Sequence, residues 1–236
     1  MENFNEALIG GMKKFNIELT DEQINKFNIY CNMLIEWNSK MNLTAIKEPT
    51  EIAVKHFVDS CSVLNYVKIK KNAKVIDIGT GAGFPGIPLK ILREDLDITL
   101  LDSLNKRLVF LNEVAKELNL ELNTIHSRAE DLGRQESHRE QYDIAISRAV
   151  APLNVLSEYS IPFVRKGGKF ISMKGPNVQS EIDEAKKAIK ILGGKYNNVV
   201  QFSIGDNSRS IVIVDKLNPT PYTYPRHGSK ISKKPL

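Results

Sequence analysis

The sequence has few cysteines and no long apolar run, and these absences narrow the class of protein. Cys31 and Cys61 are isolated and do not form a Cys-x-x-Cys spacing, which argues against both a zinc site and a disulfide framework. No apolar run approaches the roughly 20 residues that span a membrane. The N-terminus, Met-Glu-Asn-Phe-Asn-Glu, is too polar for a secretory signal. We therefore expect a cytoplasmic, monomeric protein with reduced thiols, no membrane partner and no metal.

Acidic side chains are missing from the end of the chain, after Asp215. The chain of 236 residues has a net charge of +5, with 33 Lys and Arg against 28 Asp and Glu. Four of these five charges come from Arg226, Lys230, Lys233 and Lys234, which follow Lys216 without any acid between them. Such a basic tail favours a polyanionic partner, most simply nucleic acid. A tail that only improves solubility explains the composition equally well.

The N-terminal segment 1–67 is predicted to be helical. Thr20-Asp-Glu-Gln23 has the pattern of a capping box, and Pro49 is well placed to start a later helix. On that helix His56 and Asp59 share one face. Their spacing alone is explained more simply by a surface or interface pair than by a catalytic site.

From Lys74 onward, short apolar segments alternate with helical patterns. This alternation predicts an α/β protein with a doubly wound sheet, closed by a hairpin that makes the last strand antiparallel. We expect a helical extension over 1–67, the α/β core over 68–217 and the basic tail over 218–236. The predicted strands are 74–79, 97–102, 122–127, 142–148, 169–174, 198–204 and 209–216, and Gly167-Gly168 is predicted to be the turn into the fifth.

The first predicted strand runs directly into a glycine-rich turn. Gly79, Gly81 and Gly83 follow it, and Pro85 stands where a helix would begin. Glycines remove Cβ atoms, so that a ligand can approach the backbone, and a helix N-terminus offers free N–H groups. A strand, a glycine turn and a helix therefore indicate a ligand site.

The spacing of the glycines and the position of one acid reduce the number of candidate ligands. A dinucleotide fold needs G-x-G-x-x-G directly after the strand, but the third glycine would then fall at Phe84. Asp77, two residues before the first glycine, would attract the ammonium or sulfonium of S-adenosylmethionine and repel a pyrophosphate. A nicotinamide enzyme and a purely structural turn remain the alternatives.

The ends of the next strands supply further candidate residues, because ligands bind at the carboxyl ends of strands in such sheets. Asp102 ends the second predicted strand and is suited to accept the hydroxyl protons of a ribose. Ala129 and Glu130 follow the third strand, where backbone and a carboxylate would read an adenine edge. A charged solvent loop is the alternative for this segment. A non-catalytic RNA-binding module would not explain Asp77, the glycines and Asp102 in this register.

The end of the fourth strand bears on the type of reaction. It has neither the Asn-Pro-Pro-Tyr pattern suited to methylation of a base amine nor the Pro-Cys of a covalent mechanism, and clustered acids are absent. What remains is a target atom that is already nucleophilic, and a guanine N7 fits because its lone pair can attack a methyl sulfonium without a general base. We therefore expect no catalytic residue. Arg148 is suited to contact the guanine edge, the cofactor or a phosphate, and these alternatives stay open.

These motifs resemble the bacterial 16S rRNA guanine-N7 methyltransferase family, also called glucose-inhibited division protein B, over nearly the whole chain. Phe84-Pro85-Gly86 is more specific than the glycines themselves. The other matching segments are 42–44, 56–60, 77–88, 102–107, 128–130, 147–149, 174–175 and 224–226.

The resemblance implies a class I, Rossmann-like methyltransferase fold and S-adenosylmethionine as cofactor. It implies that Asp102 binds the ribose and that the cofactor contacts Gly79, Phe84, Ala129, Glu130 and Arg148. The implied target is a guanine in the 530 loop of 16S rRNA, within the small ribosomal subunit or one of its assembly intermediates. As RNA contacts we expect His56, Asp59, Lys174, Arg226 and Lys230.

Overall fold

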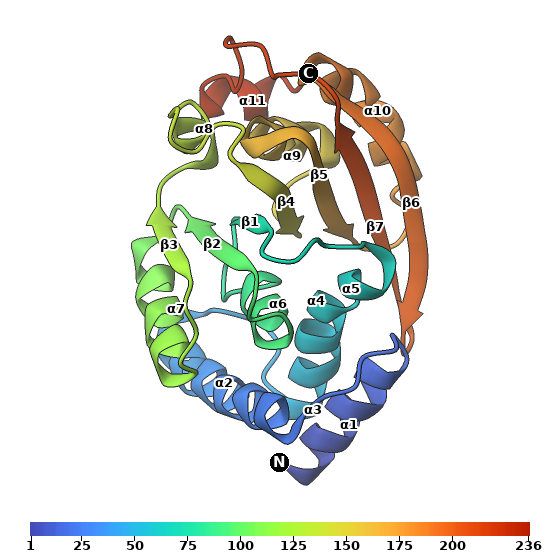
Figure 1. The fold of residues 1–236 in the computed structure, drawn as a ribbon. Helices are drawn as coiled ribbons and strands as arrows, with labels where there is room; N and C mark the ends of the chain where they lie inside the picture. The colour runs from blue at the N-terminus through green and yellow to red at the C-terminus, as the bar shows by residue number, and fades with distance from the viewer.

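The computed structural model describes residues 1–236 and contains a seven-stranded sheet flanked by helices on both faces (Figure 1). The strand order is β3-β2-β1-β4-β5-β7-β6, and β7 alone runs antiparallel to its neighbours. The predicted α/β class with an antiparallel last strand is confirmed. The strands are β1 (Lys74–Ile78), β2 (Asp97–Asp102), β3 (Asn123–His126), β4 (Tyr142–Arg148), β5 (Val164–Lys174), β6 (Gly194–Ile204) and β7 (Asn207–Lys216).

The helices begin where the sequence carries start signals. Thr20 accepts a hydrogen bond from the Gln23 backbone, and the Gln23 side chain accepts one from the Thr20 backbone, so the predicted capping box is present. Pro49 stands in the first turn of α3. The helices are α1 (Glu2–Lys13), α2 (Asp21–Met41), α3 (Pro49–Ile52), α4 (Asp59–Cys61), α5 (Val63–Tyr66), α6 (Gly86–Leu92), α7 (Asn105–Glu117), α8 (Ala129–Leu132), α9 (Leu153–Ser160), α10 (Gln179–Ile191) and α11 (Gly228–Lys233). A π-helical segment (Ala53–Val58) joins α3 to α4, and a 3-10 turn (Ile161–Phe163) follows α9. None of these helices combines the length and apolar character required to cross a bilayer.

Alternate side chains of the strands belong to two separate apolar clusters, one on each face of the sheet. Val75 packs with one face and Ile76 with the other, as the period of two requires. The first cluster contains the buried side chains of α1, α2, α6 and α7, and the second contains those of α9 and α10. The N-terminal segment 1–67 thus shares a core with the sheet and covers one of its faces. The boundaries at 67/68 and 217/218 remain predictions.

Phe57 joins the N-terminal helices to the glycine-rich turn. It is fully buried, and its ring lies between 5.1 and 6.0 Å from those of Phe4, Phe27, Tyr30 and Phe84. Full burial of such a side chain contributes about 1.5–3 kcal/mol. The aromatic cluster fixes the helices relative to the turn at the end of β1.

Three strands begin earlier than predicted, β7 by two residues and β5 and β6 by four or more. β5 starts at Val164, because the predicted turn at Gly167-Gly168 is an irregularity within the strand, between the pairs Tyr142↔Val164 and Ile144↔Lys169. β6 starts at Gly194. Its first residues are mostly polar because the strand lies at the exposed edge of the sheet, so they show no strand pattern in the sequence. The prediction of a turn was therefore wrong for Gly167-Gly168.

The basic tail folds back onto the protein. It lies along α8 and α9 and ends in α11, at the opposite end of the molecule from the N-terminus (Figure 1). Ile231 of α11 is completely buried. Helices α11 and α8 are each too short to produce a helical period in the sequence, so neither was predicted.

Candidate active site

Three cavities lie side by side along the edge of the sheet where the parallel strands end. We call them the first, middle and third cavities, with volumes of about 190, 390 and 310 Å³. The first and middle cavities share the wall residues Gly79, Asp102 and Val150, and the middle and third share His56 and Arg148. We call this row of adjoining cavities the trough, and it lies at the place that parallel α/β sheets use for ligands.

The glycine-rich turn forms the floor of the middle cavity. Gly79 has φ +67°, and a Cβ there would come within 2.8 Å of Val150. Gly83 has φ +98°, and a Cβ would come within 2.5 Å of the Tyr30 hydroxyl. Gly81, with φ +63°, has no atom closer than 4.0 Å to its Cβ position, so its backbone is open to a ligand. All three positions have a positive φ, which favours glycine, and at Gly79 and Gly83 there is also no room for a Cβ.

Asp77 lies beneath the turn and is fully buried. Its Oδ2 accepts hydrogen bonds from the Thr80 hydroxyl at 2.7 Å and from the Gly86 N–H at 2.8 Å, whereas its Oδ1 has no partner in the chain. Burial raises the pKa of this carboxyl to about 6. Asp77 is not on the wall of any of the three cavities. Within the chain its carboxylate binds the turn, and the contact with a ligand ammonium or sulfonium stays a prediction.

Asp102 stands at the end of β2, on the wall between the first and middle cavities. Its carboxylate accepts hydrogen bonds from the N–H groups of Gly81 at 3.0 Å and Leu104 at 2.9 Å, and Arg107 lies 3.2 Å away. It is only 2% exposed. The structure therefore brings the predicted ribose-binding acid to the glycine turn.

Ala129 and Glu130 begin α8 and line the first cavity, with Tyr159 of α9 also on its wall. Glu130 is buried, yet its carboxylate makes no hydrogen bond or ion pair within the chain. A carboxylate in such surroundings is free to accept from a ligand, as expected for an adenine edge. Together with the open backbone at Gly81, it fits S-adenosylmethionine better than a polyanion.

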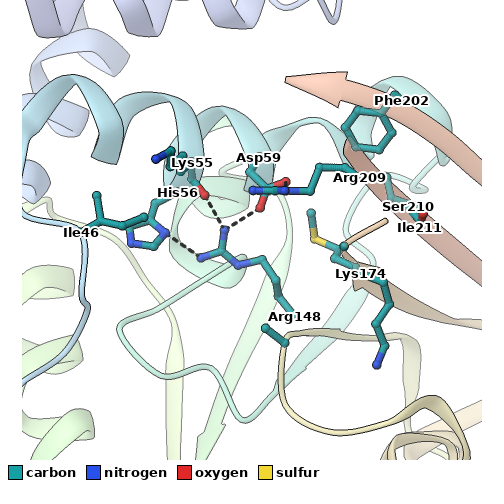
Figure 2. A pocket seen from close by; sticks show the side chains of 13 residues that line it. Ile46, Lys55, His56, Asp59, Arg148, Lys174, Phe202, Arg209, Ser210 and Ile211 are labelled. Carbon is teal, nitrogen blue, oxygen red and sulfur yellow. Dashed lines mark hydrogen bonds and ion pairs between the residues drawn. The ribbon is translucent and has the colours of Figure 1, made fainter. Parts of the chain in front are cut away.

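Arg148, at the end of β4, occupies the junction between the middle and third cavities. Its Nη1 donates to the Asp59 carboxylate at 2.9 Å and to the Lys55 carbonyl at 3.1 Å, and its Nη2 donates to Nδ1 of His56 at 3.2 Å (Figure 2). The guanidinium also lies 4.9 Å from the centre of the Phe84 ring. This one side chain therefore connects the glycine turn to the N-terminal helices.

His56 is held as a neutral ring with a defined tautomer. Because Arg148 can only donate, Nδ1 of His56 must accept, and the proton lies on Nε2, which donates to the Thr44 hydroxyl at 2.8 Å. The ring stacks on Phe84 at 4.6 Å. Burial and the Arg148 charge lower the pKa of His56 to about 3. Of the two simple interpretations, a surface or an interface pair, the structure favours the second, because Arg148 of β4 bonds both His56 and Asp59.

The third cavity is strongly basic. Lys55, Lys174, Arg148 and Arg209 line it, and its one carboxylate, Asp59, is bonded to both arginines. Lys174 forms an ion pair with Glu181 at 2.8 Å. Figure 2 shows Arg209, which comes from β7, beside the same Asp59 carboxylate that Arg148 of β4 contacts. Such a wall suits an anionic ligand.

Arg209 is a site residue that sequence reasoning missed. It lies near the start of β7, and strand starts normally face away from the ligand edge. Because β7 is antiparallel, its start lies beside the end of β5, where Lys174 pairs with Ser210. The predicted hairpin could have revealed Arg209, because a hairpin reverses the last strand and brings its start to the edge where the parallel strands end.

Two predicted RNA contacts lie away from the trough. Arg226 donates from its backbone N–H at 2.7 Å and from its guanidinium at 2.7–3.2 Å to Glu158, which is 1% exposed. That ion pair fixes Arg226 to a buried carboxylate, and its contact with RNA stays a prediction. Lys230 is exposed on α11 and does not line any of the three cavities. No group of three or more His, Cys, Asp or Glu side chains in the chain is arranged to hold a metal ion.

The fold and the site define the class of protein. A sheet of order 3-2-1-4-5-7-6 with an antiparallel β7, a glycine turn after β1 and an acid after β2 is the arrangement of a class I S-adenosylmethionine-dependent methyltransferase. Solved structures support the fold. MtNAS in complex with MTA and tNA has a TM-score of 0.56 at 15% identity, covering 81% of this chain and 74% of its own. TYW2 of M. jannaschii in complex with AdoMet has a TM-score of 0.52 at 15% identity, covering 63% and 71%.

The sequence comparisons give the particular family. The family model described as rRNA small subunit methyltransferase G, GidB, matches residues 23–212. The ribosomal RNA small subunit methyltransferase G of Desulforamulus reducens is 49% identical over the full length of both chains, and that of Clostridium tetani is 51% identical over 93% of each. This chain belongs to the rRNA small subunit methyltransferase G family. The predicted family, the enzyme class and the cofactor S-adenosylmethionine are thereby confirmed.

Proposed function

We propose that this enzyme methylates N7 of a guanine in the 530 loop of 16S rRNA. The observation that supports the proposal is the trough, in which cavities with an open glycine backbone and carboxylates adjoin a cationic cavity at Arg148. The first two cavities suit an uncharged adenosine and a cationic amino acid, and the third suits a nucleotide with its phosphate. Both ligands would then meet beside Arg148.

The cofactor-binding residues follow from the walls of the first two cavities. We propose that Asp102 accepts from the ribose, Ala129 and Glu130 bind the adenine side, and the backbone of Gly79 and Gly81 contacts the remainder. When bound, S-adenosylmethionine supplies a methyl group carried on a sulfonium. Asp77 holds the turn in shape from below, through Thr80 and Gly86.

The junction of the trough suits a reaction that releases no proton from the target base. Both ring nitrogens of His56 are engaged in hydrogen bonds, and each carboxylate oxygen of Asp59 accepts from an arginine. Neither group is free to act as a general base. A guanine N7 carries a lone pair that attacks a methyl sulfonium without any base, so these residues position and desolvate the reactants.

The third cavity is the proposed site for the target nucleotide. Lys174 and Arg209 would attract its phosphate, and Arg148 would contact the base from the cofactor side. We further propose that the enzyme acts as a monomer, because one chain supplies every wall of the trough. Because the proposed substrate is ribosomal, we expect the enzyme in the cytoplasm.

The test is methyl transfer to defined RNA. Purified enzyme is incubated with labelled S-adenosylmethionine and with naked 16S rRNA, small subunits or assembly intermediates that lack the modification, and the nucleosides are identified by mass spectrometry. We expect 7-methylguanosine, mapped to the 530 loop. A methyl group at another atom or in another loop would contradict the proposal. Light scattering tests the monomer, and a stable dimer in solution would contradict it.

A further inference from the structure

The C-terminal tail backs the wall of the first cavity without entering it. None of the residues 217–236 lines the trough, but the tail packs against α8 and α9, which supply Glu130 and Tyr159 to that wall. Ile231 is completely buried, and Pro225 lies 3.4 Å from the Cβ position of Gly133, directly after α8. The tail is therefore fixed to the two elements that shape the first cavity.

Gly228 contacts Glu130 more closely than any other residue type would allow. A Cβ at position 228 would overlap Oε1 of Glu130 and would lie 2.9 Å from its Cδ. The Glu130 carboxylate thus occupies the space of the missing side chain. Because this carboxylate makes no hydrogen bond or ion pair within the chain, its position depends on the shape of the tail at Gly228.

Arg226 provides a second, independent attachment. Its backbone N–H and guanidinium all bind Glu158, a carboxylate that is 1% exposed and would be left without its partner if Arg226 were removed. Glu158 precedes Tyr159, on the wall of the first cavity. The ion pair therefore connects the tail to α9 beside the cavity, as Gly228 does to α8.

We propose that the tail is a structural part of the cofactor site, in which Gly228 and Arg226 are positioning residues for Glu130 and Tyr159. This inference rests on the proposed binding of the adenine side in the first cavity. It gives the tail two faces with different roles. Gly228 and Arg226 face inward and act on cofactor affinity, whereas Lys230 and Lys233 are exposed and are free to meet RNA.

The substitution Gly228→Ala tests the inward face. Gly228 does not have a positive φ, and alanine is favoured over glycine in a helix, so the backbone accepts the change. The new Cβ displaces the end of a flexible side chain, which leaves the melting temperature nearly unchanged. We expect the Kd of S-adenosylhomocysteine, measured by calorimetry, to rise about tenfold, as for one lost hydrogen bond to a charged group. Gly10→Ala, at a helical glycine with open space around it, is the matched control and keeps the wild-type Kd.

A double-mutant cycle separates positioning from general loosening of the fold. In a Glu130→Ala background the space beside residue 228 is free, so Gly228→Ala has less than about a twofold further effect. An equal loss in both backgrounds, or an unchanged Kd for Gly228→Ala in the wild-type background, overturns the inference. Lys230→Ala with Lys233→Ala is expected to leave the Kd of S-adenosylhomocysteine unchanged.

The wild-type protein separates this inference from the proposed function. If it does not bind S-adenosylhomocysteine, the proposed cofactor site is wrong, and the inference falls with it. If the wild type binds and Gly228→Ala binds equally well, only the role of the tail is wrong.

Discussion

The two halves of the trough are lined by different chemical groups. The half over β1, β2 and β3 consists of backbone turns and buried carboxylates, with glycines of positive φ in the turn after β1. The half over β4, β5 and β7 consists of long cationic side chains, contributed partly by the N-terminal helices. Backbone and buried acids can match one small molecule atom by atom. Long, flexible Lys and Arg side chains, in contrast, can contact phosphates in many different positions.

This difference implies that cofactor and RNA binding respond to separate substitutions. Arg148 is the exception, because it lies on the wall of both halves and joins Phe84 to Asp59. The predictions below follow from this comparison, from the largest expected effect to the smallest.

Gly79→Val should remove cofactor binding and leave RNA binding intact. The side chain would meet Val150 and would force a positive φ on a β-branched residue, so the turn must move. We expect the Kd of S-adenosylmethionine to rise by about 100-fold or more, measured by calorimetry. Gly205→Val, with φ +57° and open space in the β6–β7 turn, is the matched control. Equal losses of RNA and cofactor affinity would contradict the division into halves.

Arg148→Ala should impair both halves at once. It removes the hydrogen bonds to His56, Asp59 and the Lys55 carbonyl, together with the contact to Phe84. We expect kcat/KM for methyl transfer to fall about 100-fold, and Arg148→Lys to restore little of it, because an ammonium cannot reproduce the planar fork. Loss of RNA affinity with normal cofactor affinity would assign Arg148 to the third cavity alone.

His56 should make the trough sensitive to acid. Its pKa is lowered to about 3 in the folded protein, against about 6.5 when unfolded, so the unfolded chain binds more protons in between. The stability from the neutral ring is complete above about pH 6.5 and is lost, by about 1.4 kcal/mol per pH unit, as the pH falls towards 3.

The measurement for His56 is urea unfolding of the wild type and His56→Gln between pH 7 and 4. Carboxylates titrate in both proteins, so the difference in unfolding free energy isolates the histidine. We expect the wild type to lose stability relative to His56→Gln as the pH falls. A constant difference across this range would show that His56 is not held neutral.

Arg209→Ala should weaken RNA binding alone. The Asp59 carboxylate keeps Arg148, so the fold loses little, but the third cavity loses one cation. We expect about tenfold weaker binding and a salt dependence reduced by about one unit of slope. Arg165→Ala, at the start of β5, on the opposite edge of the sheet, is the control. An unchanged salt slope in Arg209→Ala would remove Arg209 from the RNA site.

Local sequence patterns were sufficient to predict much of the fold and one half of the site. β2 and β4 have the predicted bounds, because their short apolar runs are flanked by polar residues. The glycine turn and Asp102 meet as predicted, since neighbouring parallel strands bring their ends together. Prediction failed where the signal was short or exposed, as in α8, α11 and the start of β6. The role of Asp77 toward the cofactor stays a prediction, and only the structure shows that its carboxylate bonds Thr80 and Gly86 beneath the turn.

The sequence by itself determined the α/β class, the glycine turn and the acid after β2, because periodicity and motif spacing are local properties of a chain. Only the tertiary structure decided the basic half of the trough. Asp59 meets Arg148 across 89 positions and Arg209 across 150, and no local pattern encodes such a meeting. The reversal of β7 and the packing of the N-terminal helices on the sheet bring these charges together. The same holds for the tail, whose composition suggested RNA but whose packing joins Gly228 to Glu130.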